Sequence, residues 1–350
     1  MRVVHVIKKR DPSCPANGMW TFAENVHAHL RAIGVDSVIV TSKNQLAEAL
    51  SNRPDIVHIH GIWHLFYHEA FRKAKSRNLK VVYSTHGMTS PWALKNGWWK
   101  KLPVWALYQK RDLYSADAIH SMSNLEESWN TSLFPKGKRL FTVPLGTDER
   151  KGDFTKSESN VILFVGRISK VKAIDDFLHA IERHCRECPF SDFSFRIIGP
   201  DERNCLRFLK KICSSMNLDK RVEFCGYMDK SRLSSEYEKA LALVLPSKSE
   251  NFGSVVIEAL SHGTVVVASK NTPWEVLSQR KCGWHVDGDV ASLKNALDDI
   301  WQAKNSGAID DMQANAVKLV DEFFRWPGIV EEVYRNYLQI VKTEQIANEK

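Results

Sequence analysis

Short apolar runs alternate along this chain with longer segments whose apolar residues recur at helical spacing. An unbroken apolar run is typical of a strand that is buried on both faces of a parallel sheet. Such runs occupy residues 3–7, 35–40, 56–60, 81–84, 118–121, 161–165, 193–198, 222–227, 242–245 and 264–268. Strands that are separated by helices in this way predict an α/β fold with doubly wound sheets.

A polar, charged stretch at residues 151–160 divides this pattern into two series. Since 350 residues exceed the usual size of one domain, we expect two domains, at residues 1–152 and 153–334. Charge is divided unevenly: residues 1–150 hold 21 Lys or Arg against 12 Asp or Glu, and the remainder holds 28 against 29. A basic first half indicates an acidic partner, such as a nucleic acid, an anionic lipid or a phosphorylated substrate.

The seven cysteines show no paired framework, which favours a reducing cytosol over a disulfide-bonded protein. The apolar run near the start, residues 3–7, is too short for a signal peptide or a membrane-spanning segment. We therefore expect a cytoplasmic protein whose membrane contacts are peripheral.

One strand–loop–helix–strand unit in the second half carries the clearest chemistry. Its loop holds Glu250, Asn251, Phe252 and Gly253, and Glu258 lies in the helix that follows. A helix that begins beside a glycine-containing loop directs free N–H groups toward an anion. The two carboxylates can accept hydrogen bonds from hydroxyl groups on either side of that anion. A phosphate flanked by hydroxyls describes a nucleotide sugar, although glutamates at this spacing also occur on solvated helices.

The longer pattern around these glutamates resembles the donor-site signature of retaining glycosyltransferases of family 4, which have the GT-B fold. It comprises Pro246-Ser247, Glu250, Phe252-Gly253, Glu258-Ala259-Leu260 and Gly263. The resemblance implies two Rossmann-like domains that face each other across a cleft, with residues 153–334 binding the nucleotide sugar. It also implies that Glu250 orients the transferred sugar, that Glu258 holds the ribose, and that a terminal helix at 335–350 packs back on the first domain.

A basic loop with Arg167 and Lys172 follows the apolar run at 161–165. Such side chains at the end of a strand can grip a diphosphate, arginine as a fork and lysine as a point charge. A solvated loop is the alternative. The loop is similar to the Gly-Arg-x-x-x-x-Lys loop of family 4, which implies that Arg167 and Lys172 also stabilise the leaving phosphate. Ala173 stands where the family has glycine.

Two further donor contacts come from the resemblance alone: Tyr227 beside the base, and Gly18 close to a phosphate, where an ordinary turn fits equally well. Asp287-Gly288-Asp289 imitates a metal-binding Asp-x-Asp pattern. It stands directly before a helical segment, where a capping role is favoured. We therefore expect no metal and no other cofactor, with a UDP- or GDP-linked sugar as substrate.

Thr85-His86-Gly87-Met88 follows a strand and resembles a loop of bacterial surface-polysaccharide glycosyltransferases. The resemblance implies that His86 contacts the transferred sugar or lies near the reacting carbon. His58 and His60 alternate on a strand and therefore share a face. The sequence places no third histidine or acidic residue beside them, so histidines of the core or the cleft edge are favoured over a metal site.

Residues 91–113 interleave tryptophans with basic residues, including Trp98, Trp99, Lys100 and Lys101. Tryptophan rings and lysine stems favour a membrane interface, and similar stretches bind single-stranded nucleic acid. A packed helical pair with a solvated basic face is the third interpretation. The run also resembles the polysaccharide enzymes, so we expect contact with an anionic membrane surface or a lipid-linked acceptor, and no nucleic acid.

The resemblance thus implies a retaining hexosyltransferase, and we expect it on the inner face of the cytoplasmic membrane. By the resemblance, its acceptor is a growing surface polysaccharide or lipid-linked glycan: O-antigen, capsule, exopolysaccharide or lipopolysaccharide core. Two alternatives stay open. A sugar-nucleotide epimerase or hydrolase on the same fold would consume the donor without an acceptor. A basic nucleic-acid-binding protein would bind oligonucleotides with a strong dependence on salt.

Overall fold

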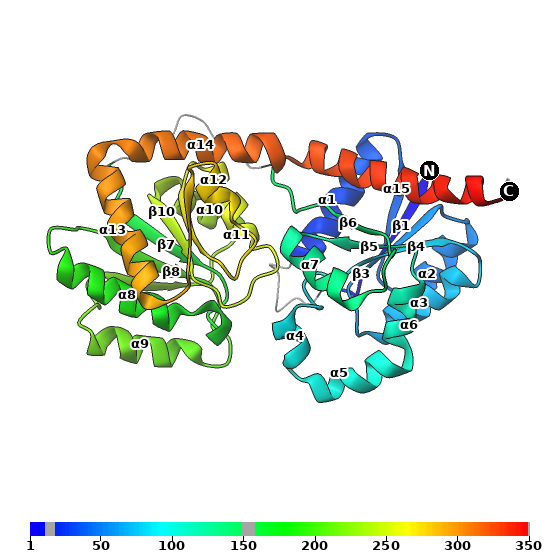
Figure 1. Cartoon of the computed structure of the whole chain (residues 1–350), viewed down its shortest axis with the longest axis horizontal. Helices are drawn as coiled ribbons and strands as arrows, with labels where there is room; N and C mark the ends of the chain where they lie inside the picture. The colour runs from blue at the N-terminus through cyan, green and yellow to red at the C-terminus, as the bar shows by residue number, and fades with distance from the viewer. Residues whose placement is uncertain (11–17, 149–157, 349–350) are drawn as a thin grey trace. The chain divides into compact units, whose positions relative to one another are not determined.

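The computed structural model describes residues 1–10, 18–148 and 158–348. It consists of two compact units, Met1–Gly146 with Arg325–Lys350, and Thr147–Phe324. Each unit is built on one six-stranded parallel sheet with helices packed against it (Figure 1). This architecture confirms the predicted fold class of two doubly wound, Rossmann-like domains.

The first sheet has the strand order β2-β1-β3-β4-β5-β6. Its strands are β1 (Arg2–Val6), β2 (Asp36–Val40), β3 (Ile56–His60), β4 (Lys80–Ser84), β5 (Ala118–Ser121) and β6 (Leu140–Thr142). The connecting helices include α1 (Gly18–Ala32), α2 (Lys43–Ser51), α3 (Leu65–Lys75) and α7 (Asn124–Leu133). The strand order reverses between β1 and β3, and open sheets of this kind bind ligands outside the carboxyl ends of the strands at such a reversal.

Between β4 and β5 the chain forms a broken helical arm, residues 91–115. It consists of α4 (Pro91–Lys95), α5 (Trp98–Val104), a π-helical segment (Trp105–Gln109) and α6 (Lys110–Ser115). Gly97 separates α4 from α5 because its φ of +67° is a left-handed conformation that glycine adopts at little cost. Pro103 lies inside α5 and lacks a backbone N–H, just before the helix widens into the π-helical segment.

The second sheet has the strand order β12-β11-β10-β7-β8-β9. Its strands are β7 (Val161–Val165), β8 (Ser194–Ile198), β9 (Val222–Gly226), β10 (Ala242–Leu245), β11 (Val265–Ser269) and β12 (Gly283–Val286). Its helices include α8 (Ile174–Glu187), α9 (Cys205–Ser215), α10 (Lys230–Lys239), α11 (Ser254–Ser261), α12 (Val276–Gln279), α13 (Val290–Ser306) and α14 (Ala308–Phe323). The order reverses between β7 and β10, so the loops after these two strands meet at one edge of the sheet.

A close backbone approach in the second unit depends on Gly199, which follows β8. Gly199 adopts φ +147°, and a Cβ there would lie 1.8 Å from the carbonyl oxygen of Gly166 after β7. The amide of Gly166 in turn donates to the carbonyl of Ile198 across 3.0 Å. Because no side chain fits at this contact, glycine is required, and it holds the carboxyl ends of β7 and β8 together.

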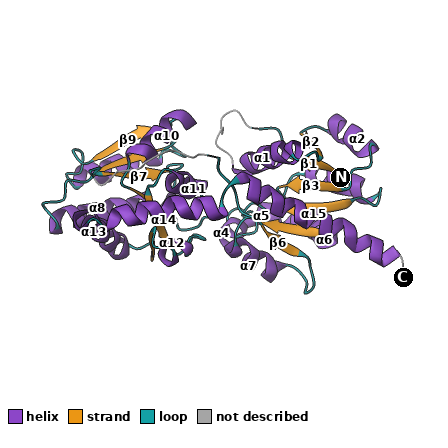
Figure 2. Cartoon of the chain, turned by 90° about the horizontal axis from the view of Figure 1, so that it is seen from above, coloured by secondary structure: helices purple, strands orange, loops and turns teal. Residues whose placement is uncertain are grey.

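The last helix, α15 (Trp326–Asn348), belongs to the first unit and packs beside α1 (Figure 2). The Trp326 side chain is 2% exposed, and a Cβ on Gly146 would lie 2.7 Å from its indole ring. The sequence predicted that the terminal helix at residues 335–350 packs back on the first domain, and the structure assigns a longer segment, Arg325–Lys350, to the first unit. The return begins at Arg325, because Trp326 already anchors the helix. The predicted boundary at residue 152 lies outside the described residues.

Candidate functional site

The loops that follow β7 and β10 carry the main donor-site predictions, and the structure brings these loops into contact. The two strands are hydrogen-bonded neighbours at the point where the strand order reverses. The amide of Lys248 donates to the carbonyl of Val171 across 2.8 Å and ties one loop to the other. Arg167, Lys172 and Glu250 therefore lie at one edge of one sheet, as the sequence pattern predicted.

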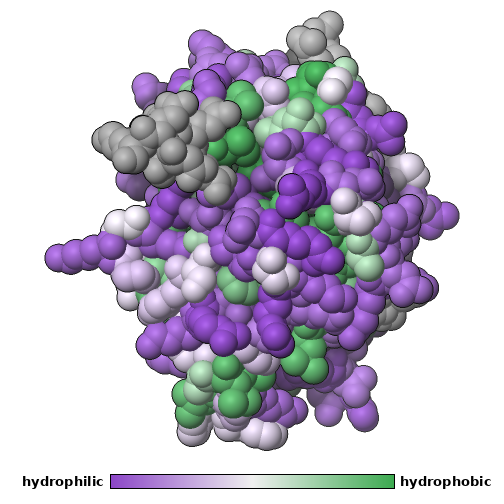
Figure 3. Space-filling view, turned by 90° about the vertical axis from the view of Figure 1, so that its right-hand side faces the viewer, coloured by the Kyte–Doolittle hydropathy of each residue, from purple (hydrophilic) through white to green (hydrophobic). Residues whose placement is uncertain are grey.

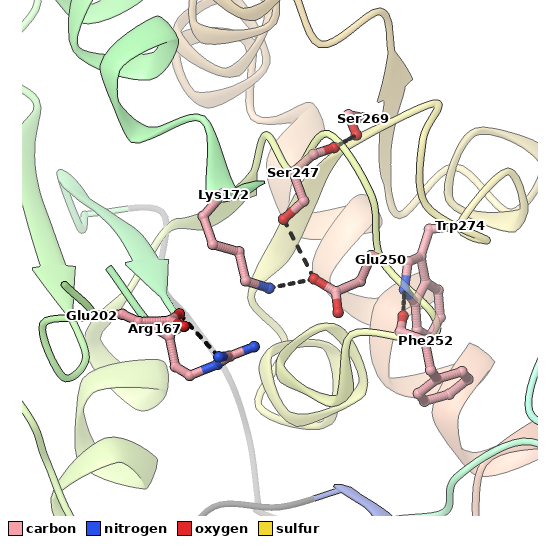
Figure 4. Close-up of polar contacts among 8 residues, drawn as sticks. All are labelled: Arg167, Lys172, Glu202, Ser247, Glu250, Phe252, Ser269 and Trp274. Carbon is pink, nitrogen blue, oxygen red and sulfur yellow. Dashed lines mark hydrogen bonds and ion pairs between the residues drawn. The ribbon is translucent and has the colours of Figure 1, made fainter. Parts of the chain in front are cut away.

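An ion pair joins the two loops. The ammonium of Lys172 contacts Glu250 Oε2, and the hydroxyl of Ser247 donates to the same oxygen across 3.4 Å (Figure 4). The Lys172 and Glu250 side chains are only 12% and 18% exposed. Partial burial makes such a pair stronger than one on the open surface. The pair thus fixes a cation and a carboxylate where sheets of this kind bind phosphate ligands.

Arg167 lies on the same loop as Lys172 but is more open to solvent, with 57% of its side chain exposed. Its guanidinium pairs with the carboxylate of Glu202, on the loop after β8, at 2.9 Å. Figure 4 shows both cations on the same side of Glu250. Since an exposed ion pair contributes little to stability, Arg167 can exchange Glu202 for an anionic ligand at small cost.

The helix α11 begins directly after this loop. Gly253 at its N-cap adopts φ +79°, which allows the abrupt turn from loop to helix. The carbonyl of Phe252 accepts a hydrogen bond from Trp274 Nε1 at 2.5 Å, and the two rings lie 5.1 Å apart. Within the helix, Glu258 accepts a hydrogen bond from the Tyr237 hydroxyl at 3.0 Å. The start of α11, with its free N–H groups, is thus held firmly at the same edge of the sheet.

Three other predicted donor contacts differ in how far they are exposed to solvent. Asn251 is partly buried within the Glu250 loop. Tyr227 is 54% exposed directly after β9, the edge strand of the sheet. Gly18 is exposed as the first residue of α1, and the loop before it lies outside the described residues. The contacts of these three residues with a donor stay predictions.

The Asp-x-Asp pattern before α13 has a structural role. Asp289 is the N-cap of that helix and accepts hydrogen bonds from the amides of Ala291 and Ser292 at 2.9 Å each. Asp287 instead pairs with Lys270 at 2.9 Å on the exposed surface. These contacts confirm the capping interpretation of Asp289, because one of its carboxylate oxygens is committed to the helix start.

His86 lies in the loop after β4 of the first unit, and its backbone adopts the unusual φ of +49°. A buried carboxylate, Glu126, fixes this loop. Its oxygens accept hydrogen bonds from the hydroxyl of Thr85 at 2.6 Å, from the amide of Gly87, and from the amide of Met122 at 2.7 Å. In the sequence Glu126 stands three residues after Ser123, a spacing that is typical of a helix-capping glutamate. Its full burial is what reveals that it also holds the His86 loop.

His58 and His60 share one face of β3, as predicted, and both are fully buried. The structure adds a third histidine that the sequence did not place beside them. His5 of β1 pairs in register with His58. The ring nitrogens that His5, His58 and His60 would offer to a metal lie within 4.8 Å of one another. Burial lowers the pKa of His5 to about 3, so this side chain is neutral at physiological pH.

The arm carries a surface of apolar and basic side chains. Trp98 and Trp99 are 61% and 62% exposed, and the ammonium of Lys100 lies 4.8 Å from the centre of the Trp99 ring. Leu102 and Leu107, which the sequence analysis did not single out, are also exposed. Hydrophobic surface is visible at the bottom of the view in Figure 3, the level at which α5 lies in Figure 1.

Lys101 differs from Lys100, because its ammonium donates to the carbonyls of Ala93 and Asn96 within the arm. Lys101 therefore links α5 to the end of α4. Among the described residues, no helix combines the length and the apolar character that a membrane span requires.

Two family models match this chain: Glycosyltransferase Family 4 over residues 42–151, and Glycosyl transferases group 1 over residues 147–318. An uncharacterized glycosyltransferase of Methanocaldococcus jannaschii is 27% identical over 56% of this chain and 50% of its own length. An uncharacterized 41.2 kDa protein in the cps region of Klebsiella pneumoniae is 24% identical over 69% of this chain and 67% of its own length. The chain thus matches half the length of the archaeal relative and about two thirds of the Klebsiella protein.

Solved structures match nearly the whole chain. Sucrose-phosphate synthase from Thermosynechococcus elongatus has a TM-score of 0.75 at 18% identity, over 98% of this chain and 99% of its own. WaaG, a glycosyltransferase involved in lipopolysaccharide biosynthesis, has a TM-score of 0.69 at 14% identity, over 95% and 99%. Anabaena HepE in complex with UDP and glucose has a TM-score of 0.71 at 13% identity, over 97% and 100%. At such identities the likeness shows the fold.

Proposed function

This chain belongs to the GT-B glycosyltransferases of family 4, and we propose that it transfers a hexose from a nucleotide sugar to a glycan, with retention of anomeric configuration. The observation that carries the proposal is the Lys172–Glu250 pair at the reversal of strand order in the second sheet. A cation and a hydroxyl-binding carboxylate side by side suit a sugar that is linked to a diphosphate. The complex of HepE with UDP and glucose supports this class of donor.

In this proposal each charged side chain has one task. Lys172 and Arg167 bind the diphosphate, and their positive charge stabilises the negative charge that develops on it as the sugar leaves. The free N–H groups at the start of α11 add to the same anion site. Glu258 accepts hydrogen bonds from the ribose, and Glu250 orients the sugar. The leaving diphosphate takes the proton of the acceptor hydroxyl as the new glycosidic bond forms.

We propose a surface polysaccharide or a lipid-linked glycan as the acceptor. WaaG is involved in lipopolysaccharide biosynthesis, and the Klebsiella relative lies in a cps region. O-antigen, capsule, exopolysaccharide and lipopolysaccharide core all belong to this class of acceptor. Such an acceptor would bring the protein to the inner face of the cytoplasmic membrane.

The test of the function has two stages. A thermal-shift screen against UDP- and GDP-sugars identifies the donor, because a bound ligand raises the melting temperature. Consumption of that donor is then followed with and without lipid-linked acceptors, in the wild type and in Glu250→Ala. The control Glu331→Ala removes a carboxylate that is 70% exposed on α15.

We expect product that depends on the acceptor in the wild type and in the control, and none in Glu250→Ala, which should still unfold in one cooperative thermal transition. Donor consumption without any acceptor would favour an epimerase or a hydrolase. Salt-dependent oligonucleotide binding without a response to any nucleotide sugar would favour a nucleic-acid-binding protein.

We propose that the arm docks the protein on an anionic membrane. Exposed tryptophans next to lysines support this, because each basic side chain near such a surface contributes about 1 kcal/mol and inserted rings add burial. The test is co-sedimentation with anionic liposomes of a triple variant, Trp98→Ala/Trp99→Ala/Lys100→Ala. Lys101 is left in place because it links α5 to α4.

The matched control for the arm is Phe190→Ala/Phe208→Ala, which removes two aromatic rings of the second unit that are 88% and 60% exposed. At moderate salt we expect the triple variant to remain in the supernatant and the control to sediment with the liposomes. Equal sedimentation of the triple variant and the wild type would show that the arm is only a packed helical pair.

A further inference from the structure

Two hydrogen-bond chains run through the histidines of the first unit. The first chain joins the Tyr337 hydroxyl to His58 Nδ1 (2.5 Å), His58 Nε2 to the Ser84 hydroxyl (2.6 Å), that hydroxyl to His120 Nδ1 (2.6 Å), and His120 Nε2 to the Val143 carbonyl (2.8 Å). A carbonyl only accepts, so His120 Nε2 carries a proton, and the direction of every other bond follows. This chain is closed, because each ring nitrogen and each hydroxyl in it has a partner.

The second chain is open. His5 Nδ1 lies 2.9 Å from His60 Nε2, and His60 Nδ1 lies 3.3 Å from His86 Nε2. Within the described residues the two outer nitrogens, His5 Nε2 and His86 Nδ1, are shielded from water and have no hydrogen-bond partner. A buried polar atom without a partner costs about 1–3 kcal/mol. Such an atom at both ends of one chain indicates that something else completes it.

The protons of the open chain have two equivalent arrangements. If they point from His5 toward His86, then His86 Nδ1 carries a proton and donates. If they point the other way, His86 Nδ1 has a free lone pair and accepts. In both arrangements every imidazole is neutral, and burial favours that state because it lowers the pKa of His5 and of His86 to about 3. The open end therefore offers a neutral group that either donates or accepts.

The open chain lies where the fold binds ligands. His5 is on β1 and His60 is the last residue of β3, and these neighbouring strands flank the reversal of strand order. His86 follows β4 at the same edge of the sheet, on the loop that the buried Glu126 fixes. Its backbone φ of +49° is a strained conformation of the kind that clusters at ligand sites.

We propose that His5 and His60 are positioning residues, which present His86 Nδ1 to a hydroxyl group of a bound sugar and let it switch between donor and acceptor. A hydroxyl suits this end because it both donates and accepts. A phosphate or carboxylate does not, because a neutral chain offers no charge to pair with it. The inference rests on the proposed function, which supplies a sugar as the ligand.

A metal ion is the rival occupant of this cluster. Metal-binding lone pairs lie in the planes of the imidazole rings and must converge on one point. The rings of His58 and His60 are instead stacked, with centroids 4.2 Å apart and planes inclined by 28°. Both nitrogens of His58 are also committed to the closed chain. A hydroxyl at the open end needs neither chain to be broken.

The experiment is ¹H–¹⁵N spectroscopy of the protein labelled at histidine, since imidazole nitrogen shifts distinguish protonated from unprotonated atoms. The His86 signals are assigned by their loss in His86→Gln. Three probes are compared: the nucleotide sugar found in the thermal-shift screen, UDP or GDP alone, and the free monosaccharide. We expect a neutral His86 that exchanges between both tautomers in the free protein and is driven to one by the nucleotide sugar.

The measurements with the nucleotide alone and with the free monosaccharide show which part of the ligand changes the tautomer of His86. A response to the free monosaccharide would show that the hydroxyls of the sugar are sufficient. A response to the nucleotide sugar, without one to the nucleotide, would place it on the donor. The same response to UDP or GDP alone would overturn the inference.

Matched variants separate positioning from mere folding. The amide of glutamine reaches as far as His Nε2, and that of asparagine as far as His Nδ1. His60→Gln therefore keeps a partner for His5 and removes the one for His86, whereas His60→Asn keeps a partner for His86. We expect His60→Gln to lose the ligand-driven change at His86 and to lower kcat/KM roughly three- to tenfold, the effect of one neutral hydrogen bond. His60→Asn should restore most of both.

The control Tyr337→Phe removes the hydroxyl that begins the closed chain. It should lower the melting temperature and leave the His86 response intact. Equal loss of the response in this control, a doubly protonated His86 at neutral pH, or bound metal whose removal changes the His86 signals would each overturn the inference. If no nucleotide sugar binds, the proposed function fails, whereas the tautomers of the free protein still test the open chain.

Discussion

Replacing Glu250 with glutamine should have opposite effects on the binding of the nucleotide and on transfer. In the free protein Glu250 pairs with Lys172, and the two side chains are only partly exposed. A diphosphate that binds Lys172 comes to lie near a carboxylate of the same sign. Glu250→Gln removes that repulsion and keeps a hydrogen-bonding amide. The variant should therefore bind free UDP or GDP more tightly, while it loses the carboxylate that orients the sugar for transfer.

The size of the effect follows from the geometry of the pair. When one ammonium bridges a carboxylate and a phosphate, their charges lie ~6 Å apart, because each contact is about 3 Å long. Two unit charges at that distance interact with roughly 0.7–2.8 kcal/mol as the effective dielectric falls from about 80 to about 20. The partial burial of both side chains favours the middle of this range, about 1–2 kcal/mol. Affinity should therefore rise roughly 5- to 30-fold.

Isothermal titration calorimetry with UDP and GDP at two salt concentrations measures this rise, and donor consumption measures transfer. Lys172→Ala and Arg167→Ala are the reference variants, and each should weaken binding by about 1.5–3 kcal/mol because it removes a charge-assisted contact. Melting temperatures confirm that all three variants are folded. The rise for Glu250→Gln should shrink at high salt, since screening weakens the repulsion that the change removes.

One result would refute this reasoning. If Glu250→Gln weakens nucleotide binding as much as Lys172→Ala does, the carboxylate acts by holding the ammonium in place, and its repulsion of the ligand is negligible. Unchanged affinity in all three variants would move the phosphate site away from the loops after β7 and β10.

Two other expectations concern metal and acid. Transfer should be unchanged in excess chelator, because Lys172 and Arg167 are available for the diphosphate and Asp289 caps a helix; activity that is lost and then restored by magnesium or manganese would contradict this. The first unit should lose stability as the pH falls from about 6.5 toward 4. In this range the histidines of the unfolded chain take up protons, whereas the buried histidines of the folded unit stay neutral. Burial lowers the pKa of His86 to about 3 and that of His120 to about 4. Above pH 6.5 these histidines are neutral in the folded and the unfolded chain, so the loss of stability is absent there. Denaturant midpoints at pH 7.5 and 5 measure the loss, and equal midpoints would contradict it.

Local patterns in the sequence were enough to predict the strands of the second unit and the edge of the sheet at which its charged loops meet. Apolar runs predict the parallel strands, and residues after such strands must gather at one edge, which brings Lys172 and Glu250 together. Positions whose backbone conformation favours glycine are harder to recognise from the sequence. Ala173 adopts φ +50°, a left-handed conformation that explains why glycine is favoured at this position.

The histidine cluster could not be predicted in the same way. His5 meets His58 only because β1 pairs with β3 in one register, although the intervening strand β2 is closer in sequence. Strand order and register depend on contacts distant along the chain, and a single sequence does not reveal them. The role of Glu126 in holding the His86 loop is hidden for the same reason, because its partners Thr85 and Gly87 lie about 40 residues away along the chain.

The return of α15 has a consequence for the order in which the protein folds during synthesis. Trp326 closes over Gly146, and Tyr337 bonds to His58, so the first unit needs residues that leave the ribosome after the whole of Thr147–Phe324. At about 5–20 residues per second, these roughly 180 residues delay its completion by roughly 9–36 s. The second unit, which is continuous in sequence, can fold first. We expect nascent chains stalled before Trp326 to be cleaved by protease within the first unit and to resist cleavage within the second, and the opposite pattern would contradict this order.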